Sequence, residues 1–567
     1  MRGSPLLKGY LNMKKQLHLE LLFFAYKFDY RKLNRTSLFP QYKHSVKFPA
    51  MKAIVVGSGV GGIASALRLR SMGIDVEILE SCPDAGGRAR TFSYGGHTFD
   101  AGPTVITAPW LFDELFELFG EKRSDHIRFL PCDPWYRLIF HDLSSMDLVS
   151  SVEAQEAEIR KISPEDADNY QAYLDHCEAL YSVGYEQLGA ADFSRFSSML
   201  STLPHLLRLG AFRSLWRHTA RYFKDKRVRQ AFSLQTLLVG GNPLNTTAIY
   251  GLIHAMERRG GIWFAKGGTG ALIKALIELG KRHGIKVHYN STVSALHTSG
   301  KPGHTVNGIS YIKKGEESSL STDLLVWGGD PIKAYQMAGT RRLSLVERGR
   351  LKTVHSSMGL YVMYFKTKRP YSEVAHHSII LSKRWEGLLH QVFSGKTLPH
   401  DPSLYLHRPA ATDPGFQLSN GDLFYVLAPV PHLGNFNGWE EQQKSFQKTV
   451  VSVLEESALP NLSSELALVE SIDPRYFKHT LHSHLGAGFS IAPRLSQSAW
   501  FRFHNKMDKV KGMYLCGAGV HPGGGLPGVA TSAKVIQKMI TDDFQESVST
   551  HPNSLQTQKT PDKERAA

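Results

Sequence analysis

The chain has 567 residues, of which 21% are charged and 42% hydrophobic, and it carries a formal net charge of +16. A chain of this length exceeds what one hydrophobic core usually serves, so we expect two or three domains. Its mean hydropathy of −0.24 excludes a protein mainly embedded in a membrane, and no uncharged apolar run reaches the roughly 18 residues of a transmembrane helix.

Residues 1–50 form a basic extension with ten Lys or Arg and two acidic residues. A glutamate and a lysine interrupt its apolar patch, and no small-residue cleavage site follows, unlike a signal peptide. The segment fits a basic presequence, an arm that binds a membrane surface, or translated sequence upstream of a true start at Met51. We favour the last interpretation, because the first predicted strand begins two residues after Met51.

A dinucleotide-binding motif follows this extension. The apolar run Ala53–Val56 predicts a buried parallel strand, after which Gly57, Gly59 and Gly62 stand in G-x-G-x-x-G spacing. The first glycine permits a tight turn, the second lets the backbone approach a pyrophosphate, and the third lets the next helix pack against the strand. Glycines alone are weak evidence, so the elements that follow them decide the interpretation.

Those elements appear in the required order. A helix is predicted over Val60–Met72 and a second strand over Val76–Leu79, which ends at Glu80. The free N–H groups at the start of the helix would face the phosphates. An acidic residue at this spacing is typical of a group that bonds a ribose hydroxyl and disfavours a 2′-phosphate. NADP is therefore not expected, whereas NAD and FAD both remain open.

The stretch after Glu80 favours FAD. Gly86 and Gly87 precede Arg88, which resembles the second glycine pair of the FAD-dependent amine oxidase and carotenoid desaturase superfamily. In that superfamily the loop runs beside the FAD and its arginine approaches the cofactor. The alternative is an ordinary glycine-rich turn with a solvated arginine.

Residues 151–255 are predicted to be mostly helical and contain a basic segment. Nine Lys or Arg and one acidic residue lie between Arg195 and Arg229, interleaved with leucine, phenylalanine and tryptophan. Such a helical stretch suits an anionic membrane surface, with Arg213, Arg217 and Arg221 as the contact residues. A solvated helical face is the alternative. Nucleic acid is not expected, because no nucleic-acid motif accompanies the segment.

The next segments return to α/β character. A helix is predicted over Gly270–Gly280, a strand over Val287–Val293, and a buried strand within Asp323–Asp330. Residues 345–475 contain alternating strands and predict an antiparallel sheet.

A second strand–glycine–helix unit lies near the C-terminus. A strand is predicted over Met513–Cys516, a turn at Gly517 and Gly519, and a helix from about Val529. A cofactor longer than one mononucleotide could be held at both ends, with its ADP half at the first unit and its flavin half at the second. The polar segment 546–567 is predicted to be disordered.

Cysteine and histidine spacing predicts no metal site. The four cysteines are scattered without a C-x-x-C pair, and the 26 histidines show no H-E-x-x-H or comparable ligand spacing. Neither a disulfide framework nor a zinc site is indicated, and reduced thiols in the cytoplasm are expected.

Taken together, nearly all of residues 51–545 resembles the bacterial and fungal type of phytoene desaturase, within the flavin-dependent carotenoid desaturase family. The stretches that carry this resemblance include AGGRA, FDAGPTV, RQAFSLQTLLVGGNP, WFAKGGTGAL, YVLAPVPHLG, FSIAPRLSQSAWFRFHN and YLCGAGVHPGGGLPGV. One departure is Ala492, where the resemblance leads us to expect an acidic residue that helps shape the active site. At Gly524 the branch often has alanine, a minor difference.

The resemblance implies an α/β fold with α+β insertions. It comprises a Rossmann-like FAD-binding domain split in sequence (51–150, 256–335 and 481–545), an antiparallel-sheet substrate domain (336–480) and a helical membrane-facing lid (151–255). By the same resemblance, the FAD-contacting residues are Gly57, Gly59, Gly62, Glu80, Arg88, Gly102, Val293, Asp330, Gly517, Gly519, Gly528 and Val529.

The implied activity is successive dehydrogenation of phytoene towards lycopene by hydride transfer to FAD, which the protein supports by orienting substrate and excluding water. No single catalytic base is assigned. The expected partners are membrane-dissolved phytoene, a membrane surface, and quinone or oxygen as electron acceptor, for a peripheral membrane protein in the cytoplasm whose oligomeric state is open.

Several alternatives remain open. They are a C30 diapophytoene desaturase, a 3,4-desaturase, a terminal-methyl oxidase, a flavin isomerase, an amine oxidase, and a non-enzymatic lipid-binding relative.

Overall fold

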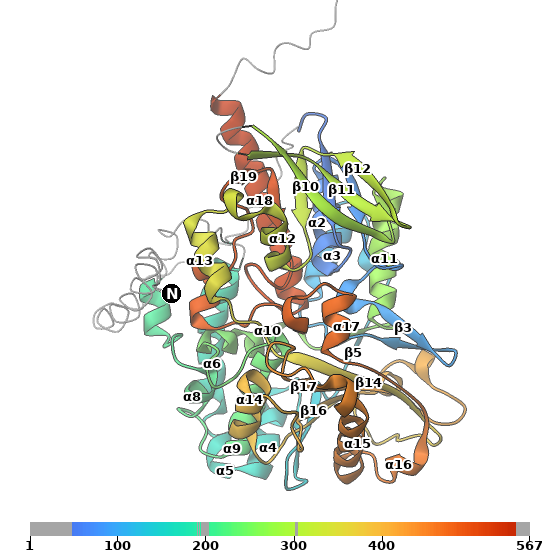
Figure 1. The fold of residues 1–567 in the computed structure, drawn as a ribbon. Helices are drawn as coiled ribbons and strands as arrows, with labels where there is room; N and C mark the ends of the chain where they lie inside the picture. Colours follow the sequence, from blue (N-terminus) through green and yellow to red (C-terminus); the bar gives the residue numbers. More distant parts are fainter. Residues whose placement is uncertain (1–47, 190, 192, 194–202, 301–303, 551–567) are drawn as a thin grey trace, which may run out of the picture.

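The computed structural model describes residues 48–189, 191, 193, 203–300 and 304–550 (Figure 1). Most of the basic extension 1–50 therefore lies outside the described residues, as do residues 195–202 of the basic segment. The last helix, α18 (Leu526–Thr550), extends five residues into the segment 546–567, for which the sequence predicts disorder. The remainder of that segment, 551–567, lies outside the described residues.

A five-stranded parallel sheet forms the nucleotide-binding core. It brings together strands from both ends of the chain, and the observed bounds confirm the predicted strand–helix–strand unit, including helix α2 (Val60–Ser71), to within one residue. In spatial order the strands are β20 (Met513–Leu515), β13 (Leu324–Trp327), β1 (Lys52–Val56), β2 (Asp75–Leu79) and β9 (Lys286–His288).

Successive side chains of β1 pack into two hydrophobic layers on opposite faces of this sheet. Ala53 and Val55 pack with α2, α11 (Thr269–Arg282) and α18. Ile54 packs on the other face, against α12 (Pro331–Ala338) and a smaller sheet. Both faces of β1 are thus covered, which explains why its sequence is a continuous apolar run.

The smaller sheet corrects one predicted element. The single strand expected over Val287–Val293 is two strands in two different sheets, because Asn290 adopts a positive φ of 54° and turns the chain. The smaller sheet comprises β10 (Ser291–Ser299), β11 (His304–Lys313) and β12 (Glu316–Ser321), with β19 (Val510–Lys511) parallel to β11.

A seven-stranded sheet forms the other half of the molecule, below the parallel sheet in Figure 1. Its neighbouring strands are antiparallel, as predicted for residues 345–475, except that β15 runs parallel to β6. The order is β18 (Leu466–Ile472), β14 (Gly359–Thr367), β17 (Leu423–Val430), β16 (Leu404–His407), β15 (His377–Ile380), β6 (Tyr136–Ile139) and β7 (Ser145–Leu148). β6 and β7 come from the segment 51–150 that the sequence analysis assigns to FAD binding.

One face of this sheet packs against α15 (Trp439–Ser457), through residues that include Trp439 and Phe446. The opposite face turns towards a helical region and encloses a cavity with it. The helices of this region are α4 (Val152–Ile162), α5 (Pro164–Ala167), α6 (Tyr170–Tyr181), a π-helical turn (Ser182–Gln187), α8 (Leu215–Thr219), α9 (Lys226–Ala231) and α10 (Leu252–Gly260).

Shorter elements connect these layers. The remaining helices are α3 (Trp110–Glu117), α13 (Leu345–Thr353), α14 (Trp385–Ser394), α16 (Leu462–Glu465) and α17 (Pro474–His479), and the remaining strands are β3 (Thr91–Tyr94), β4 (His97–Asp100), β5 (Phe129–Pro131) and β8 (Trp263–Ala265). Across the described part of the chain, none of the helices combines the length and the apolar character required to cross a membrane.

Candidate functional site

The first glycine turn has the geometry that its sequence predicts. Gly57 follows β1 with a φ of 92°, which favours glycine. A β-carbon on Gly62 would lie 2.0 Å from the carbonyl oxygen of Gly57, so only glycine lets α2 approach the strand this closely. A β-carbon on Gly59 would meet nothing within 4 Å, and Gly59 lines the cavity. The turn therefore leaves an open cradle in front of the first residues of α2.

Glu80 lies directly across this cradle. Its carboxylate accepts hydrogen bonds from the backbone N–H of Ser58 at 2.7 Å, the hydroxyl of Ser58 at 2.6 Å and the backbone N–H of Cys82 at 2.8 Å. The side chain is buried and lines the cavity. These bonds hold the carboxylate at the end of β2, where the motif requires an acceptor for a ribose.

The second glycine pair lies alongside the first turn. The N–H of Gly86 donates to the carbonyl of Ser58 at 2.9 Å, and a β-carbon on Gly87 would lie 3.3 Å from the Cα of Gly59. This contact places Arg88 at the cavity.

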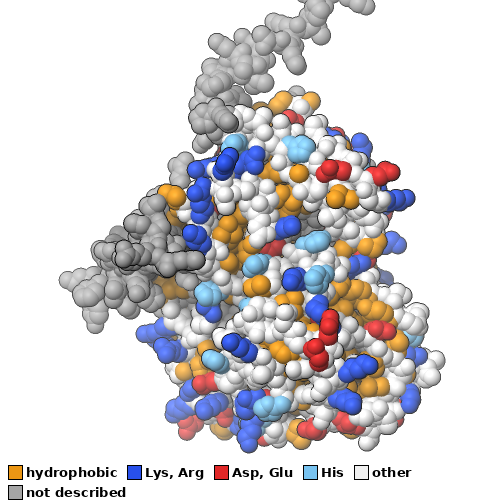
Figure 2. Space-filling view, in the orientation of Figure 1, with side chains coloured by type: hydrophobic (Ala, Val, Ile, Leu, Met, Phe, Trp, Pro, Cys, Tyr) orange, Lys and Arg blue, Asp and Glu red, His pale blue; other side chains and the backbone are white. Residues whose placement is uncertain are grey.

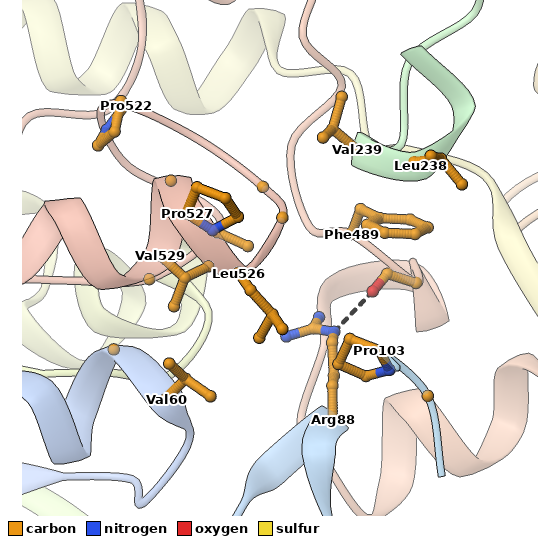
Figure 3. Close-up of a pocket in the computed structure, with 18 of the residues that line it drawn as sticks. Val60, Arg88, Pro103, Leu238, Val239, Phe489, Pro522, Leu526, Pro527 and Val529 are labelled. Atoms are coloured by element: carbon orange, nitrogen blue, oxygen red, sulfur yellow. Dashed lines mark hydrogen bonds between the residues drawn. The ribbon is translucent and has the colours of Figure 1, made fainter. Parts of the chain in front are cut away.

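Arg88 is a half-buried cation, and no described carboxylate accepts a hydrogen bond from it. It donates to the carbonyls of Gly488 (2.6 Å) and Ala487 (3.4 Å) and to the hydroxyl of Ser483 (3.1 Å), all neutral acceptors. Burial lowers the pKa of Arg88, and the nearby Asp330 carboxylate partly offsets this effect. Figure 3 shows the guanidinium between Leu526 and Pro103, below Phe489. A partly buried charge of this kind favours an electron-rich or anionic ligand.

Three helices begin at the same cavity. Residues at the N-termini of α2, α12 and α18 all line it, and α2 and α18 touch at their first turns. Helix N-termini favour phosphate and other negatively charged groups.

A single cavity of about 930 Å³ brings most of the predicted cofactor residues together. Gly62 and Gly519 do not line it and act by close packing instead, since a β-carbon on Gly519 would lie 2.4 Å from Cδ of Pro331. The predicted residues that do line it are Gly57, Gly59, Glu80, Arg88, Gly102, Val293, Asp330, Gly517, Gly528 and Val529.

Asp330 lines the cavity but also has a structural role. Its carboxylate caps α12 by accepting from the N–H of Ile332 at 3.0 Å, and it accepts from the N–H of His484 at 3.1 Å and the hydroxyl of Ser490 at 3.2 Å. It therefore joins the parallel sheet to the segment that holds Arg88.

The same cavity continues into an apolar chamber. One wall is the inner face of the seven-stranded sheet, and the other is the helical region. The sheet contributes Leu360, Val362, Ile379, Leu404 and Leu427, and the helical region contributes Leu188, Leu206, Phe212, Leu237, Leu238, Val239, Leu252 and Met256. The chamber suits a long hydrocarbon.

Few polar side chains interrupt this chamber. The hydroxyl of Thr104 lies 3.0 Å from that of Tyr405 and 2.9 Å from that of Tyr425, which donates to the carbonyl of Gly102 at 2.6 Å. Burial raises the pKa of both tyrosines, so they remain neutral hydrogen-bonding groups. This network extends from Gly102, a predicted cofactor residue, into the substrate chamber.

Sequence reasoning missed this network and two charged wall residues, Glu257 and Arg494. Glu257 is buried and accepts from the hydroxyl of Tyr136 at 3.1 Å. Arg494 lines the cavity two residues after Ala492, which is buried and is not among the lining residues. Three of these residues carried a signal, because Thr104, Tyr425 and Arg494 lie in the stretches FDAGPTV, YVLAPVPHLG and FSIAPRLSQSAWFRFHN.

A buried arginine clamps the C-terminal glycine loop. The guanidinium of Arg502 donates to the carbonyls of Val520 (2.9 Å), Ala518 (2.6 Å), Ile491 (3.2 Å) and Gln497 (3.2 Å). Ala518 lines the cavity. Arg502 thus fixes the loop between β20 and α18, although it does not itself line the cavity.

The predicted membrane-contact residues lie outside the cavity. Arg213, Arg217 and Arg221 are exposed, and none forms an ion pair with another described residue. Figure 2 shows Lys and Arg side chains gathered over α8 and α9. The described part of the basic segment consists of short helices rather than one long amphipathic helix. However, Leu203, Leu206, Ala211 and Phe212 of this segment line the cavity, so it contributes to both the charged surface and the chamber wall.

Comparison with known proteins identifies the group to which the site belongs. Residues 60–326 match the family model of flavin containing amine oxidoreductases. The chain is 39% identical over 501 residues to a lycopene-forming phytoene desaturase of Pseudescherichia vulneris, covering 87% of this chain and all of that protein. It is 35% identical to a neurosporene-forming phytoene desaturase of Cereibacter sphaeroides, covering 87% of this chain and 95% of that one.

Solved structures support the fold. An oxidoreductase from Methanosarcina mazei superposes with a TM-score of 0.60 at 17% identity, covering 86% of this chain and all of the other. Putrescine oxidase bound to putrescine superposes with a TM-score of 0.58 at 12% identity, covering 88% of this chain and all of the other. At these identities the likeness extends to the fold alone.

Proposed function

This chain belongs to the phytoene desaturase family of FAD-dependent oxidoreductases, and on that premise we propose that it desaturates phytoene in successive steps towards lycopene. The observation that carries the proposal is the continuous cavity, which joins a cofactor cradle with two glycine units to an apolar chamber. A non-enzymatic lipid-binding protein would not need the cradle, and an oxidase of small amines would not need so long an apolar wall.

The residues of the cradle fit FAD. Gly59 leaves open space for a pyrophosphate at the start of α2, and Glu80 is held where a ribose hydroxyl would donate to it. Arg88 supplies a half-buried positive charge near the chamber, beside the N-terminus of α18. When bound, the flavin supplies the acceptor for the hydride removed from an allylic carbon.

The chamber walls orient the polyene and exclude water. Leu360, Val362 and Leu427 line the chamber from the sheet, and Leu237 and Leu238 line it from the helical region. Walls of this kind cannot hold a hydrocarbon by hydrogen bonds, so its position follows from the shape of the chamber.

The second hydrogen leaves the substrate as a proton. The developing positive charge is spread over several carbons, so the proton needs no strong base, and we assign no single catalytic residue. A quinone or oxygen would serve as the final electron acceptor.

The substrate enters from a membrane surface. Arg213 and Arg221 support this part of the proposal, because their guanidinium groups both lie within 4 Å of the position that a β-carbon of Gly210 would occupy. Two like charges in this position, with no ion pair to a described carboxylate, favour an anionic surface as their partner. The same segment contributes Leu206 and Phe212 to the chamber. A membrane bound to this segment would therefore lie next to the substrate chamber.

The direct test is to express the full chain in cells that accumulate phytoene and no later carotene, and to analyse the extracted pigments by chromatography and absorption. Lycopene is the expected product. Neurosporene or ζ-carotene would indicate fewer steps, whereas unchanged phytoene with flavin-loaded protein would overturn the proposal. Parallel cells that accumulate the C30 precursor diapophytoene test the choice of substrate length.

A further inference from the structure

Glu257 is an acidic residue in the wall of an otherwise apolar chamber. It lies on α10, its side chain is 1% exposed, and it is among the residues that line the cavity. Its neighbours on this helix, Leu252 and Met256, line the same cavity with apolar side chains. Burying a carboxylate is costly unless the charge is paired, so the contacts of Glu257 decide what it does.

Only one oxygen of this carboxylate has a hydrogen-bond donor among the described residues. Oε1 accepts from the hydroxyl of Tyr136 at 3.1 Å, which joins α10 to β6 of the sheet wall. Oε2 is buried and accepts no hydrogen bond. Nδ1 of His254 lies 3.9 Å from Oε2, which is too far for a hydrogen bond, and Nε2 of His254 pairs with the hydroxyl of Tyr170 at 2.9 Å. Unpaired buried oxygens are rare, and each one calls for an explanation.

Lysine and arginine side chains do not neutralise Glu257 in the described part of the chain, since none forms an ion pair with it. Arg258 is adjacent in sequence, but it donates to the carbonyl of Val149 at 2.8 Å and lies over the ring of Trp135. Burial and the charge of Glu257 raise the pKa of Tyr136, so this tyrosine stays a neutral donor.

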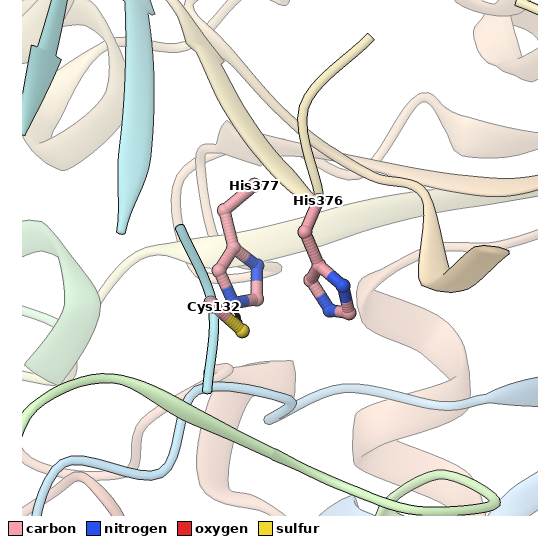
Figure 4. A group of neighbouring side chains, drawn as sticks. All are labelled: Cys132, His376 and His377. Carbon is pink, nitrogen blue, oxygen red and sulfur yellow. Dashed lines mark hydrogen bonds between the residues drawn. The ribbon is translucent and has the colours of Figure 1, made fainter. Parts of the chain in front are cut away.

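The polar cluster on the far side of Tyr136 is also uncharged. The rings of Tyr136 and His377 lie 5.7 Å apart, and Nδ1 of His377 lies 2.7 Å from the hydroxyl of Tyr405. Figure 4 shows the imidazole of His377 directed at the sulfur of Cys132, with the ring of His376 beside it. Burial lowers the pKa of His376, lowers that of His377 to about 3 and raises that of Cys132 to about 12. This cluster therefore supplies no positive charge to Glu257.

The helix that carries Glu257 packs against the segment that leads from the cofactor cradle into the chamber. This segment follows Gly102, a predicted cofactor residue. The hydroxyl of Thr107 donates to the sulfur of Met256 at 3.8 Å. A β-carbon on Gly260 would lie 2.4 Å from the carbonyl oxygen of Thr107. Gly102, Thr107 and Met256 all line the cavity, so the carboxylate lies in the wall that adjoins the cradle.

We propose that the carboxylate of Glu257 stabilises the positive charge that develops on the polyene as the hydride leaves it. This inference rests on the desaturation proposed above. A fixed charge in a site without water acts strongly on charge that develops during a reaction. The polyene is neutral before and after the reaction, so Glu257 favours the transition state and not the bound substrate. It acts through its charge alone, and no proton is transferred to it.

Two variants separate the charge of Glu257 from its hydrogen bond. Glu257→Gln keeps an oxygen that accepts from Tyr136 and removes the charge, whereas Tyr136→Phe removes the bond and keeps the charge. The FAD-loaded full chain is mixed with phytoene in vesicles under nitrogen, and the loss of flavin absorbance is followed. We expect this rate to fall about a hundredfold in Glu257→Gln and less than about tenfold in Tyr136→Phe. The phytoene concentration for half-maximal rate should not change in Glu257→Gln.

Glu347→Gln is the matched control, because Glu347 is a buried carboxylate that caps α13 and does not line the cavity. Its rate should equal that of the wild type, and flavin content reports whether each variant has folded. Equal losses in Glu257→Gln and Tyr136→Phe, or a Glu257→Gln protein as fast as the wild type, would overturn the inference. A wild-type protein whose flavin phytoene does not reduce would instead contradict the proposed function.

A binding measurement tests the charge without any reaction. The ligands are a long isoprenoid tertiary amine, which is protonated at pH 7, and the hydrocarbon of the same shape, both in uncharged detergent micelles. Their affinities for the FAD-loaded protein are measured from the change in flavin absorbance. The wild type should bind the amine about tenfold more tightly than the hydrocarbon, and Glu257→Gln should bind the two equally. A wild type without this preference, or a preference that persists in Glu257→Gln, would refute the role of Glu257.

Discussion

A β-carbon placed on Gly61 would lie 3.1 Å from both the backbone nitrogen and the Cα of Gly517. This contact joins the first glycine turn of the chain to the last one. Gly61 lies in the first turn of α2 and Gly517 follows β20, and both line the cavity. The two halves of the cofactor site therefore meet backbone to backbone, and neither half can be displaced without moving the other.

Substitutions of two glycines in the first turn should affect folding and cofactor binding differently. In Gly62→Ala the new β-carbon would lie 2.0 Å from a backbone carbonyl, so we expect destabilisation of about 1–3 kcal/mol or more from overpacking. In Gly59→Ala the β-carbon meets no protein atom but enters the cradle, so the protein should fold and bind less FAD. Flavin absorbance per chain and the thermal unfolding midpoint distinguish the two. Equal losses of stability would contradict this assignment.

Glu80 should contribute to FAD affinity directly. Glu80→Gln keeps the shape but removes the charge that accepts from Ser58 and Cys82. A hydrogen bond to a charged group contributes about 1.5–3 kcal/mol, so the dissociation constant for FAD should rise about ten- to a hundredfold. Ser58→Ala is the matched control, because Ser58 bonds Glu80 but does not line the cavity. Affinity measured by flavin fluorescence should change much less in that control.

Arg502 should hold the flavin loop without touching the cofactor. Arg502→Met leaves four buried carbonyls unsatisfied, which should cost about 1–3 kcal/mol for each group that finds no water. We expect a lower thermal midpoint and release of flavin on gel filtration. Arg502→Lys keeps the charge but cannot reach all four carbonyls, so it should be intermediate. A flavin-loaded Arg502→Met protein of normal stability would contradict the role of clamp.

Acid sensitivity should arise partly from His218. This residue is fully buried, and neither ring nitrogen has a hydrogen-bond partner. Burial, with His176 and nearby arginines, lowers the pKa of His218 from 6.5 to about 3. The unfolded chain binds this proton below pH 6.5 and the folded one does not. The free energy of unfolding is therefore unaffected above pH 6.5 and falls by about 1.4 kcal/mol per pH unit below it, down to about pH 3.

His218→Phe tests this prediction, since it removes the titrating group. Between pH 7.5 and pH 5 the variant should lose about 2 kcal/mol less stability than the wild type. His400→Phe is the control, because the side chain of His400 is 77% exposed. The measurement is the urea unfolding midpoint at the two pH values. Equal shifts of this midpoint in the wild type and both variants would disprove the prediction.

Charge reversal should weaken docking on anionic membranes. In the triple variant Arg213→Glu, Arg217→Glu, Arg221→Glu, each lost basic residue removes about 1 kcal/mol of attraction, so binding should weaken about a hundredfold at low salt. Co-sedimentation with vesicles that contain phosphatidylserine measures it. Reversing Lys313, Lys314 and Lys511 makes the same change of net charge on the small sheet. If both triple variants bind equally, the docking face lies elsewhere.

Local patterns in the sequence predicted the cofactor half of the molecule well. The unit from β1 to Glu80 and the helix α11 match the predicted bounds closely, because apolar runs and glycine spacing are patterns that extend over only a few residues. The break at Asn290 was missed, since a single residue at positive φ leaves little trace in an apolar run. The β15–β6 pairing and the contact between Cys132 and His377 join distant segments, which no local pattern encodes.

The contacts in the chamber wall also join distant segments, so local sequence patterns did not predict them. Tyr405 and Tyr425 lie on neighbouring strands and meet Thr104 only after the seven-stranded sheet has formed. Arg502, like Tyr425, lies in a stretch that carried the family resemblance, yet its role became clear only when its four carbonyl partners were located.

The place of α18 has a consequence for synthesis on the ribosome. The apolar face of α2 emerges first, but its partners β20 and α18 are made last. Until β20 and α18 have been synthesised, the nascent chain exposes the apolar surface of an incomplete nucleotide-binding core. A domain formed by one continuous segment can fold as it leaves the ribosome. This domain cannot, because it is formed by segments from both ends of the chain. Its yield in a cell should therefore depend on chaperones that bind the growing chain, and a stop codon before β20 should leave an insoluble fragment rather than a smaller folded one.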